Sequence, residues 1–115
     1  MLCADATGLF LQNHIPHMSK LNLSAEACRL PVPWRSTVLG KAAGANVKVL
    51  RMDASAYPHE THPFVEALLV VDGHMNLEID GQLICVQAGE VFLVPAGQPH
   101  AVAAGSQGTL VIIDQ

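Results

Sequence analysis

The chain has 115 residues, a formal net charge of −4 and a mean hydropathy of +0.33, which suits one small domain with a modest core. All six basic residues lie in the first 51 positions, so the rest of the chain has no Lys/Arg cluster for nucleic acid or an anionic membrane. No stretch reaches the roughly 18 apolar residues of a membrane helix and no secretory signal is recognisable, so we expect a cytoplasmic protein that binds neither nucleic acid nor membrane.

The cysteines give no sign of a stabilising framework. Cys3, Cys28 and Cys85 are odd in number and form no C-x-x-C pair. Neither a set of disulfides nor a thiolate zinc site is therefore indicated. We expect buried, reduced thiols.

The first segment differs from the rest of the chain. Residues 1–20 show no clean periodicity, and we expect a disordered or loosely attached extension there. A single domain is expected over residues 21–115. It should begin with a short helix, because Ser24 can cap the stretch AEACRL that follows it, before the prolines at 31 and 33. An irregular loop is the alternative.

Short β-rich runs follow from Ser36 onward, separated by Gly, Pro and Asp. In chain order they are STVL, NVKVLRM, EALLVV, HMNLEI, QLICVQ, EVFLV, HAVA and TLVIID. Their close spacing is typical of an all-β sandwich or barrel and not of alternating βα units. Asp80-Gly81 is the preferred pair for a type I′ hairpin, because both positions need φ > 0.

Two of these runs, LICV and VFLV, are apolar on both faces. A strand of this kind is usually covered on both sides. The barrel interior would cover one side, and a partner subunit is the simplest cover for the other. We therefore expect a homodimer.

Residues 59–66 read HETHPFVE and concentrate polar chemistry. In a strand, residues of equal parity share a face, so Glu60, His62 and Glu66 would lie together. His59 would point the other way unless a bulge or a turn at Pro58 swings it back. Imidazole and carboxylate groups in an apolar neighbourhood suit a divalent metal such as Fe, Mn, Ni, Co or Zn. A polar cluster that binds only water is the alternative.

A second segment, GEVFLVPAGQPHAV at residues 89–102, complements the first. It contains a five-residue strand between Gly89 and a Pro-x-Gly turn, and His100 begins the next strand. Such a rigid turn would fix the direction of His100, as a ligand from a separate strand requires.

Together these two segments resemble the cupin superfamily. The second cupin motif, G-x5-P-x-G-x2-H-x3-N, is matched by Gly89, Pro95, Gly97 and His100, with Ala104 at the final position. The first motif, G-x5-H-x-H-x3or4-E-x6-G, is matched by His62, Glu66 and Gly73. The resemblance covers about residues 36–113. It implies a double-stranded β-helix, or jelly-roll barrel, with three histidines and one glutamate around a metal near the wider mouth.

The resemblance assigns His62, Glu66 and His100 as metal ligands by position. Glu60 stands where the family has its first histidine, and Ala54 stands at the opening glycine. Glu60 could complete a site of two histidines and two carboxylates, which favours harder metals. The alternatives are that His59 reaches in, that only three ligands remain, or that the metal has been lost.

Two functions follow from this resemblance. The first is a metal-dependent enzyme of dioxygenase or isomerase type, acting on a small organic substrate. Glu60 or His59, whichever is not coordinated, would do the acid–base work, and Tyr57 could donate a hydrogen bond at the mouth. The second is a non-catalytic small-ligand-binding or sensor protein whose metal site is altered or lost.

The basic residues limit the ligand. Those of the barrel region are Arg35, Lys41, Lys48 and Arg51. We expect each of them on the solvated surface, although the alternation of strand 46–52 could turn one inward. Phosphate esters usually need an Arg or Lys clamp. A neutral or singly charged, partly apolar ligand is therefore expected.

Overall fold

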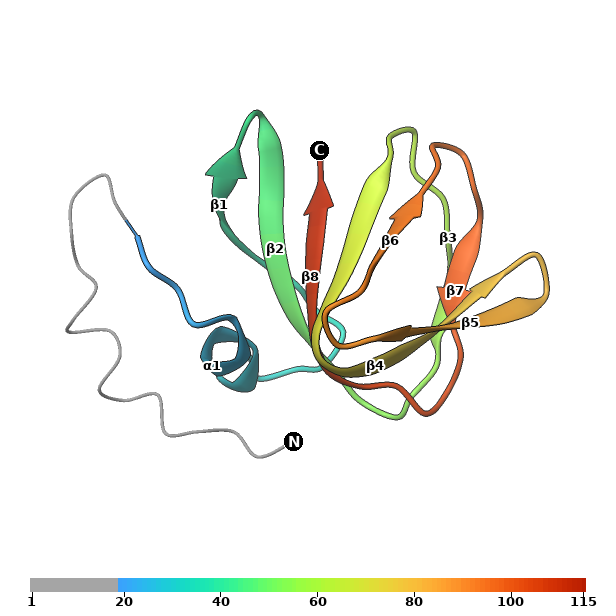
Figure 1. Ribbon diagram of the computed structural model, residues 1–115, viewed down its shortest axis with the longest axis horizontal. Coiled ribbons are helices and arrows are strands. Elements are labelled where there is room, and N and C mark those ends of the chain that lie inside the picture. The colour runs from blue at the N-terminus through green and yellow to red at the C-terminus, as the bar shows by residue number, and fades with distance from the viewer. Residues whose placement is uncertain (1–18) are drawn as a thin grey trace.

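The computed structural model describes residues 19–115. This part of the chain contains α1 (Leu23–Cys28), β1 (Thr37–Ala42), β2 (Ala45–Met52), β3 (Tyr57–Glu60), β4 (Glu66–Ile79), β5 (Gln82–Gln87), β6 (Val91–Val94), β7 (His100–Val102) and β8 (Gln107–Asp114). The strands form one antiparallel sheet that curls into a barrel (Figure 1). The expected all-β jelly-roll barrel with a short helix is confirmed. The expected extension over residues 1–20 lies, except for its last two residues, outside the described part.

The long strand β4 connects the two sides of the barrel (Figure 1). Its first residues pair with β6 and its last residues pair with β5 and β7, while β8 runs along much of its length. The register with β8 shifts between Val70 and Asp72. Just beyond, Gly73 has φ +73, and a Cβ there would collide with the backbone carbonyl of Gln107. A bulge that only glycine accommodates thus lets one strand bend and serve both sides.

The hairpin between β4 and β5 has the geometry that the sequence predicts. Asp80 has φ 51 and Gly81 has φ 76, as a type I′ turn requires at its two central positions. The flanking pair is Ile79 and Gln82. The Asp-Gly prediction is therefore confirmed.

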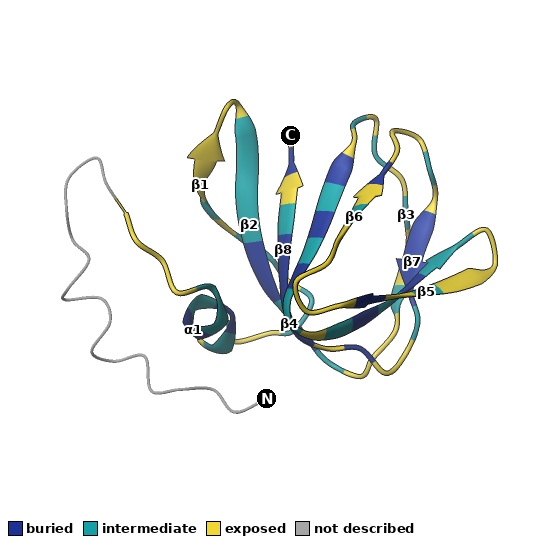
Figure 2. Ribbon diagram, in the orientation of Figure 1, coloured by how far each residue is buried: buried dark blue, intermediate teal, exposed yellow. Residues whose placement is uncertain are grey.

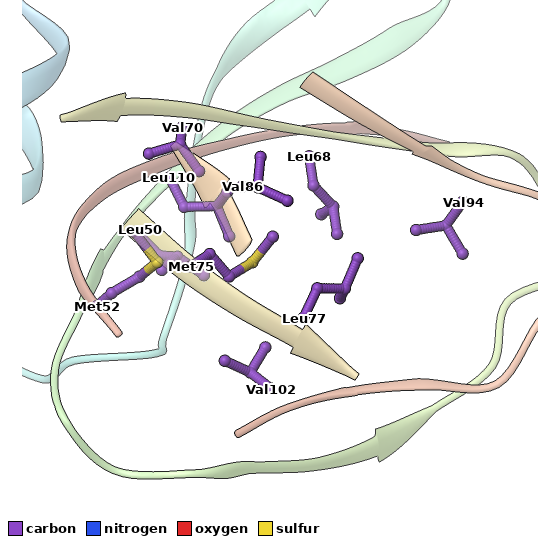
Figure 3. Close-up of a cluster of buried hydrophobic side chains, with 10 residues drawn as sticks. All are labelled: Leu50, Met52, Leu68, Val70, Met75, Leu77, Val86, Val94, Val102 and Leu110. Atoms are coloured by element: carbon purple, nitrogen blue, oxygen red, sulfur yellow. The ribbon is translucent and has the colours of Figure 1, made fainter. Parts of the chain in front are cut away.

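The main core fills the barrel (Figure 3). It consists of Leu50, Met52, Leu68, Val70, Met75, Leu77, Val86, Val94, Val102 and Leu110. A second cluster lies outside the sheet, where Ala27 of α1 packs against Val49 and Val111. Strand β2 is therefore buried on both faces over its second half, as Figure 2 shows. A strand can therefore be apolar on both faces because the barrel core covers one face and α1 covers the other.

The helix begins at Leu23, so its N-cap lies two residues before the predicted cap Ser24. Asn22 is the N-cap, and its side-chain oxygen accepts from the backbone N–H of Ala25 at 3.0 Å. Ser24 lies inside the helix and donates to Oδ2 of Asp72 at 2.6 Å. The prediction of Ser24 as the cap is wrong because its hydroxyl bonds to β4, whereas Asn22 offers an equally good acceptor.

The outer faces of β5 and β6 carry apolar side chains in contact with solvent. Leu83, Val91 and Leu93 are 66%, 53% and 61% exposed. Cys85 is likewise exposed and is free, so the expectation of a reduced thiol holds for it but the expectation of burial is wrong. Cys28 is half-buried and disulfide-bonded, so the expectation of a reduced thiol is wrong there. Within residues 19–115, no helix has the length and apolar character needed to span a membrane.

Candidate metal centre

Strand β3 delivers two side chains to the barrel mouth through a bulge. Tyr57 pairs with Val102 and Glu60 pairs with His100, and the register shifts between the two pairs. The extra residue brings Tyr57 and Glu60 into the same cavity although their parities differ. Residues 57–60 are not among the eight β-rich runs expected from the sequence, because Tyr-Pro-His-Glu has no apolar alternation, although the parity argument treats residues 59–66 as a strand.

The same bulge leaves His59 outside the cavity. Its side chain is 67% exposed and its Nε2 atom lies 3.9 Å from Oε1 of Glu78. The alternative in which His59 reaches into the metal site is therefore not supported by its position. Strand parity predicts this orientation of His59 but does not predict that Tyr57 faces inward.

His62 lies in the loop between β3 and β4 and not in a strand. Its backbone carbonyl accepts a hydrogen bond from the N–H of Gly97 at 2.8 Å. Its ring stacks on Phe64, with centroids 5.2 Å apart and planes at 13°. His62 therefore lies beside Glu60 because of these loop contacts. The prediction from parity within a regular strand placed it correctly but for the wrong reason.

Glu66 and His100 are the first residues of β4 and β7, and their side chains meet in the cavity. The Pro95–Gly97 turn is closed by the N–H of Gln98, which donates to the carbonyl of Pro95 at 3.2 Å. Nδ1 of His100 donates to the carbonyl of Gln98 at 3.0 Å, which directs Nε2 inward. That Nε2 atom lies 3.1 Å from Oε1 of Glu66, and both side chains are about 6% exposed.

The four predicted ligands are brought together at this point. Ligand atoms of Glu60, His62 and His100 all lie within 4.8 Å of one another. Nε2 of His62 is 3.6 Å from Oε2 of Glu60 and 3.6 Å from Oε2 of Glu66. Two atoms bound to one metal at about 2.1 Å each can be at most about 4.2 Å apart. The 3.6 Å separations of His62 from the two glutamates and the 3.1 Å separation of His100 from Glu66 lie within this limit, so these contacts have the size of a single-ion site.

The hydrogen-bonding pattern leaves a place for a cation. Nε2 of His62 is buried and has no hydrogen-bond partner among the described residues. If His100 is neutral with its proton on Nδ1, its Nε2 lone pair faces the carboxylate of Glu66. These two acceptor atoms, Nε2 of His100 and Oε1 of Glu66, are 3.1 Å apart and need a proton or a metal ion between them. The donor set therefore fits a divalent metal.

Burial governs the protonation of Glu66. Removal from water raises the pKa of its carboxyl above the usual value, while the neighbouring His62 and His100 act in the opposite direction. The carboxylates of Glu60 and Asp114 add to the increase. A carboxylate in such a place is more easily neutralised by a bound cation than left ionised alone.

A cavity of about 130 Å³ opens beside the cluster. Its floor is apolar, with Leu50, Leu68 and Met75 among its lining residues. Trp34 and Tyr57 form an aromatic wall, with ring centroids 5.6 Å apart. The combination of an apolar floor, a few polar groups and a metal-sized cluster is typical of a site for a small organic molecule.

Trp34 is held in an unusual backbone conformation at the mouth. It has φ 67, a region that bulky residues rarely adopt. Its indole N–H donates to Oδ1 of Asp53 at 2.7 Å, and the backbone N–H of Ser55 donates to the same oxygen. These bonds lower the pKa of Asp53, the contribution of Ser55 being the largest. No sequence pattern pointed to Trp34, because its role depends on the conformation of this loop.

Lys48 also lines the cavity, and the expectation that it lies on the solvated surface is wrong. Its ammonium group is 2.8 Å from Oδ2 of Asp114, which is 5% exposed. The sequence signal for an inward-facing Lys48 was its strand parity, which it shares with Leu50 and Met52. Sequence reasoning did not identify Asp114 as part of the site.

The cupin domain model matches residues 48–115, which is more than half of the chain. The chain belongs to the cupin family. No curated protein matches it. The resemblance suggested by the two motifs is therefore confirmed for the family and for the barrel fold.

Solved structures agree on the cupin fold. A cupin-2 domain protein from Shewanella frigidimarina superposes with a TM-score of 0.74 at 21% identity, covering 82% of this chain and 92% of that one. A Neisseria meningitidis protein gives 0.72 at 22%, covering 84% and 98%. A cupin from Desulfitobacterium hafniense gives 0.67 at 18%, covering 84% and 92%. At these identities the likeness shows the fold alone.

Proposed function

We propose that this cupin binds one divalent transition metal through Glu60, His62, Glu66 and His100 and uses the adjoining cavity to hold a small organic molecule. Fe, Mn, Ni, Co and Zn are the candidate metals. The observation that carries the proposal is the buried Nε2 atom of His62, which has no hydrogen-bond partner within residues 19–115 and lies 3.6 Å from a carboxylate oxygen on each side. A buried polar atom in this state costs free energy that a metal bond would recover.

The chemistry proposed is that of a metal-dependent enzyme of isomerase or dioxygenase type. When bound, a divalent ion supplies Lewis acidity toward a carbonyl or enol oxygen. Tyr57 lines the same cavity and can donate a proton there. The negative charge of Glu60 is the main cause that raises the pKa of Tyr57, so the phenol keeps its proton at neutral pH. The apolar floor excludes water from the reacting molecule.

A non-catalytic ligand-binding cupin is the second candidate. It is favoured by the position of His59, which is exposed and remote from the cavity. If Glu60, His62 and His100 all coordinate the metal, no histidine of the described part of the chain remains free in the cavity to act as a general base. Binding of a small molecule without its conversion, measured by mass spectrometry of the recovered ligand, would support this candidate.

Metal analysis of the purified protein tests the proposal directly. We expect about one transition metal ion per chain, or a marked rise in thermal stability when Fe, Mn, Ni, Co or Zn is added. His62→Ala and His100→Ala should each abolish metal retention, whereas His74→Ala on a different part of β4 should not. Absence of stoichiometric metal together with no stabilisation by any added metal would contradict the proposal.

We also propose a homodimer. The exposed outer face of β6 supports it, because Val91 and Leu93 lie next to Ala67 and Leu69 of β4 and form an apolar surface. A cytoplasmic location remains a prediction from the sequence.

A further inference from the structure

Lys48 occupies a place in the barrel where a cation is unusual. It shares the inner face of β2 with Leu50 and Met52, both of which belong to the barrel core. Its side chain is 24% exposed, and it contacts Oδ2 of Asp114 at 2.8 Å. The other oxygen of Asp114 accepts from the side-chain amide of Asn46 at 3.2 Å. The ammonium group is therefore anchored from one side by a carboxylate that is itself fixed.

Among residues 19–115, Lys48 is the only Lys or Arg that lines the cavity. The guanidinium of Arg51 turns to the other side of β2 and donates to the carbonyl of Leu30 at 3.0 Å. Arg35 lines a separate surface hollow near Val32. A negatively charged ligand entering the cavity would meet Lys48 and no second basic residue of the described part.

The lysine also lies close to the candidate metal centre. Ile113 pairs with Ala67 across β8 and β4, so Asp114 and Glu66 adjoin each other at the mouth. Both residues line the cavity, as does Lys48. A lysine ammonium group has three N–H donors. Within residues 19–115, the one hydrogen-bond partner of the Lys48 ammonium group is Asp114. Donors therefore remain for a molecule beside the metal.

The charge of the cavity depends on the metal. Its lining contains three carboxylates, those of Glu60, Glu66 and Asp114, and one ammonium. With all four ionised and the histidines neutral, the metal-free cavity carries an excess of two negative charges and repels an anion. A divalent cation cancels this excess. The same cavity then offers a metal and an ammonium group to one small anion.

We propose that the ligand of this cavity is a small organic monocarboxylate, held between the metal and Lys48, and that metal and carboxylate bind cooperatively. The inference rests on the proposed metal site and names the chemical class of its ligand. The cavity of about 130 Å³ restricts that ligand to a short chain. The apolar floor accommodates the hydrocarbon part, and Asp114 is a positioning residue that holds the ammonium in place.

The chain carries its own reporter for the test. Trp34 is the one tryptophan of the sequence, and its ring lines the same cavity. Its fluorescence can be followed while butyrate, or its neutral analogue butyramide, is added to metal-free and Zn-loaded protein. Zinc is suitable because it is redox-inactive. Calorimetry of Zn binding, with and without butyrate, provides a second readout.

We expect a saturable change with butyrate in the Zn-loaded protein, and affinity at least about tenfold weaker for butyramide or without metal. Because coupling is reciprocal, butyrate should tighten Zn binding by the same factor. Lys48→Met should lower the butyrate affinity at least about tenfold, Lys48→Arg should lower it less, and Lys41→Met on exposed β1 should leave it unchanged. Zn affinity without butyrate should be retained in Lys48→Met.

Lys48→Met leaves the buried Asp114 carboxylate without its cation, which destabilises the fold. The double variant K48M/D114N removes both charges and should show the same loss of butyrate binding in a folded protein. Zinc binding with equal responses to butyrate and butyramide would overturn this inference alone, as would equal affinities in Lys48→Met and Lys41→Met. Failure of Zn and of every other candidate metal to bind would overturn the proposed function and this inference with it.

Discussion

Glu60 changes the charge of the candidate centre relative to the usual cupin pattern, in which a histidine stands at that position. A centre of two imidazoles and two carboxylates can neutralise a divalent ion completely. Oxygen ligands also favour harder ions such as Mn and Fe over softer ones. Because Glu60 lies 3.6 Å from His62, we expect this substitution to affect metal choice directly.

The first prediction separates Glu60 from its neighbour His59. Glu60→Ala should weaken metal binding by more than the roughly 10–100-fold typical of an outer-shell change, because a direct ligand is lost. His59→Ala is the matched control and should leave affinity unchanged, since that side chain is 67% exposed. Calorimetric titration with Mn and Zn measures both. Unchanged affinity in both variants would indicate a three-ligand site.

The second prediction concerns pH and Glu66. Burial raises the folded-state pKa of Glu66 above its unfolded value, so ionising this group opposes folding in the metal-free protein. Its favourable contribution is complete below the unfolded pKa of about 4.3 and is lost as pH rises through the raised folded pKa. Glu66→Gln keeps the shape and removes the titration.

In the presence of a chelator, Glu66→Gln should therefore unfold at higher urea than the parent at neutral pH, and the difference should disappear near pH 4. With metal present the order should reverse, because the variant has lost a ligand. A chelated variant that is less stable than the parent at neutral pH would show that the ionised carboxylate is satisfied without a metal.

At the scale of residues, the sequence predicted the location of the centre better than its details. His62, Glu66 and His100 could be assigned because motif spacing limits where they can lie. Trp34 and Asp114 could not, because their positions depend on a left-handed loop residue and on a cross-strand neighbour far away in sequence. Lys48 was recognisable only through strand alternation, which cannot decide which of two faces is inside.

At the scale of elements, β4 determines how the barrel closes. The sequence predicted its two halves as separate strands, because Asp72-Gly73 resembles a turn. In the structure the chain continues through a bulge, since β8 pairs on both sides of it. Local signals cannot distinguish a bulge from a turn here, because both use glycine at positive φ.

The third prediction tests this bulge. Alanine at position 73 must adopt positive φ and must also displace the backbone carbonyl of Gln107. Gly73→Ala should therefore lower the free energy of unfolding by about 3 kcal/mol or more. Gly44→Ala also has positive φ, at +79, but its Cβ would meet open space. The control should lose only about 1–2 kcal/mol. Urea unfolding followed by Trp34 fluorescence measures the difference, and equal losses would mean that the close approach is unimportant.

At the scale of the whole molecule, apolar surface remains on the outside of the barrel. Val65, Val91, Leu93 and Ile113 are each more than a third exposed. Val91 and Leu93 belong to β6 and Ile113 belongs to β8, while Val65 directly precedes β4, which pairs with both of these strands. The helix α1 covers other parts of the outer surface and leaves these residues uncovered.

The fourth prediction is that this surface forms the dimer. Leu93→Lys should convert the protein to a monomer at micromolar concentration in light scattering, because a charge would be buried in an apolar contact. Leu83→Lys is the matched control, since Leu83 is equally exposed but lies on β5, away from this surface. A parent protein that is already monomeric would contradict the dimer, and dissociation by both substitutions would place the contact elsewhere.

The central position of β8 has a consequence for protein synthesis. This strand lies between β2 and β4, both of which are made well before it. Until the ribosome has released β8, the two flanking strands have no hydrogen-bonded neighbour between them, and their apolar inner faces have no opposite wall. The barrel mouth also lacks Asp114 until then. We therefore expect the barrel, and with it the candidate metal centre, to form only after this strand has been translated.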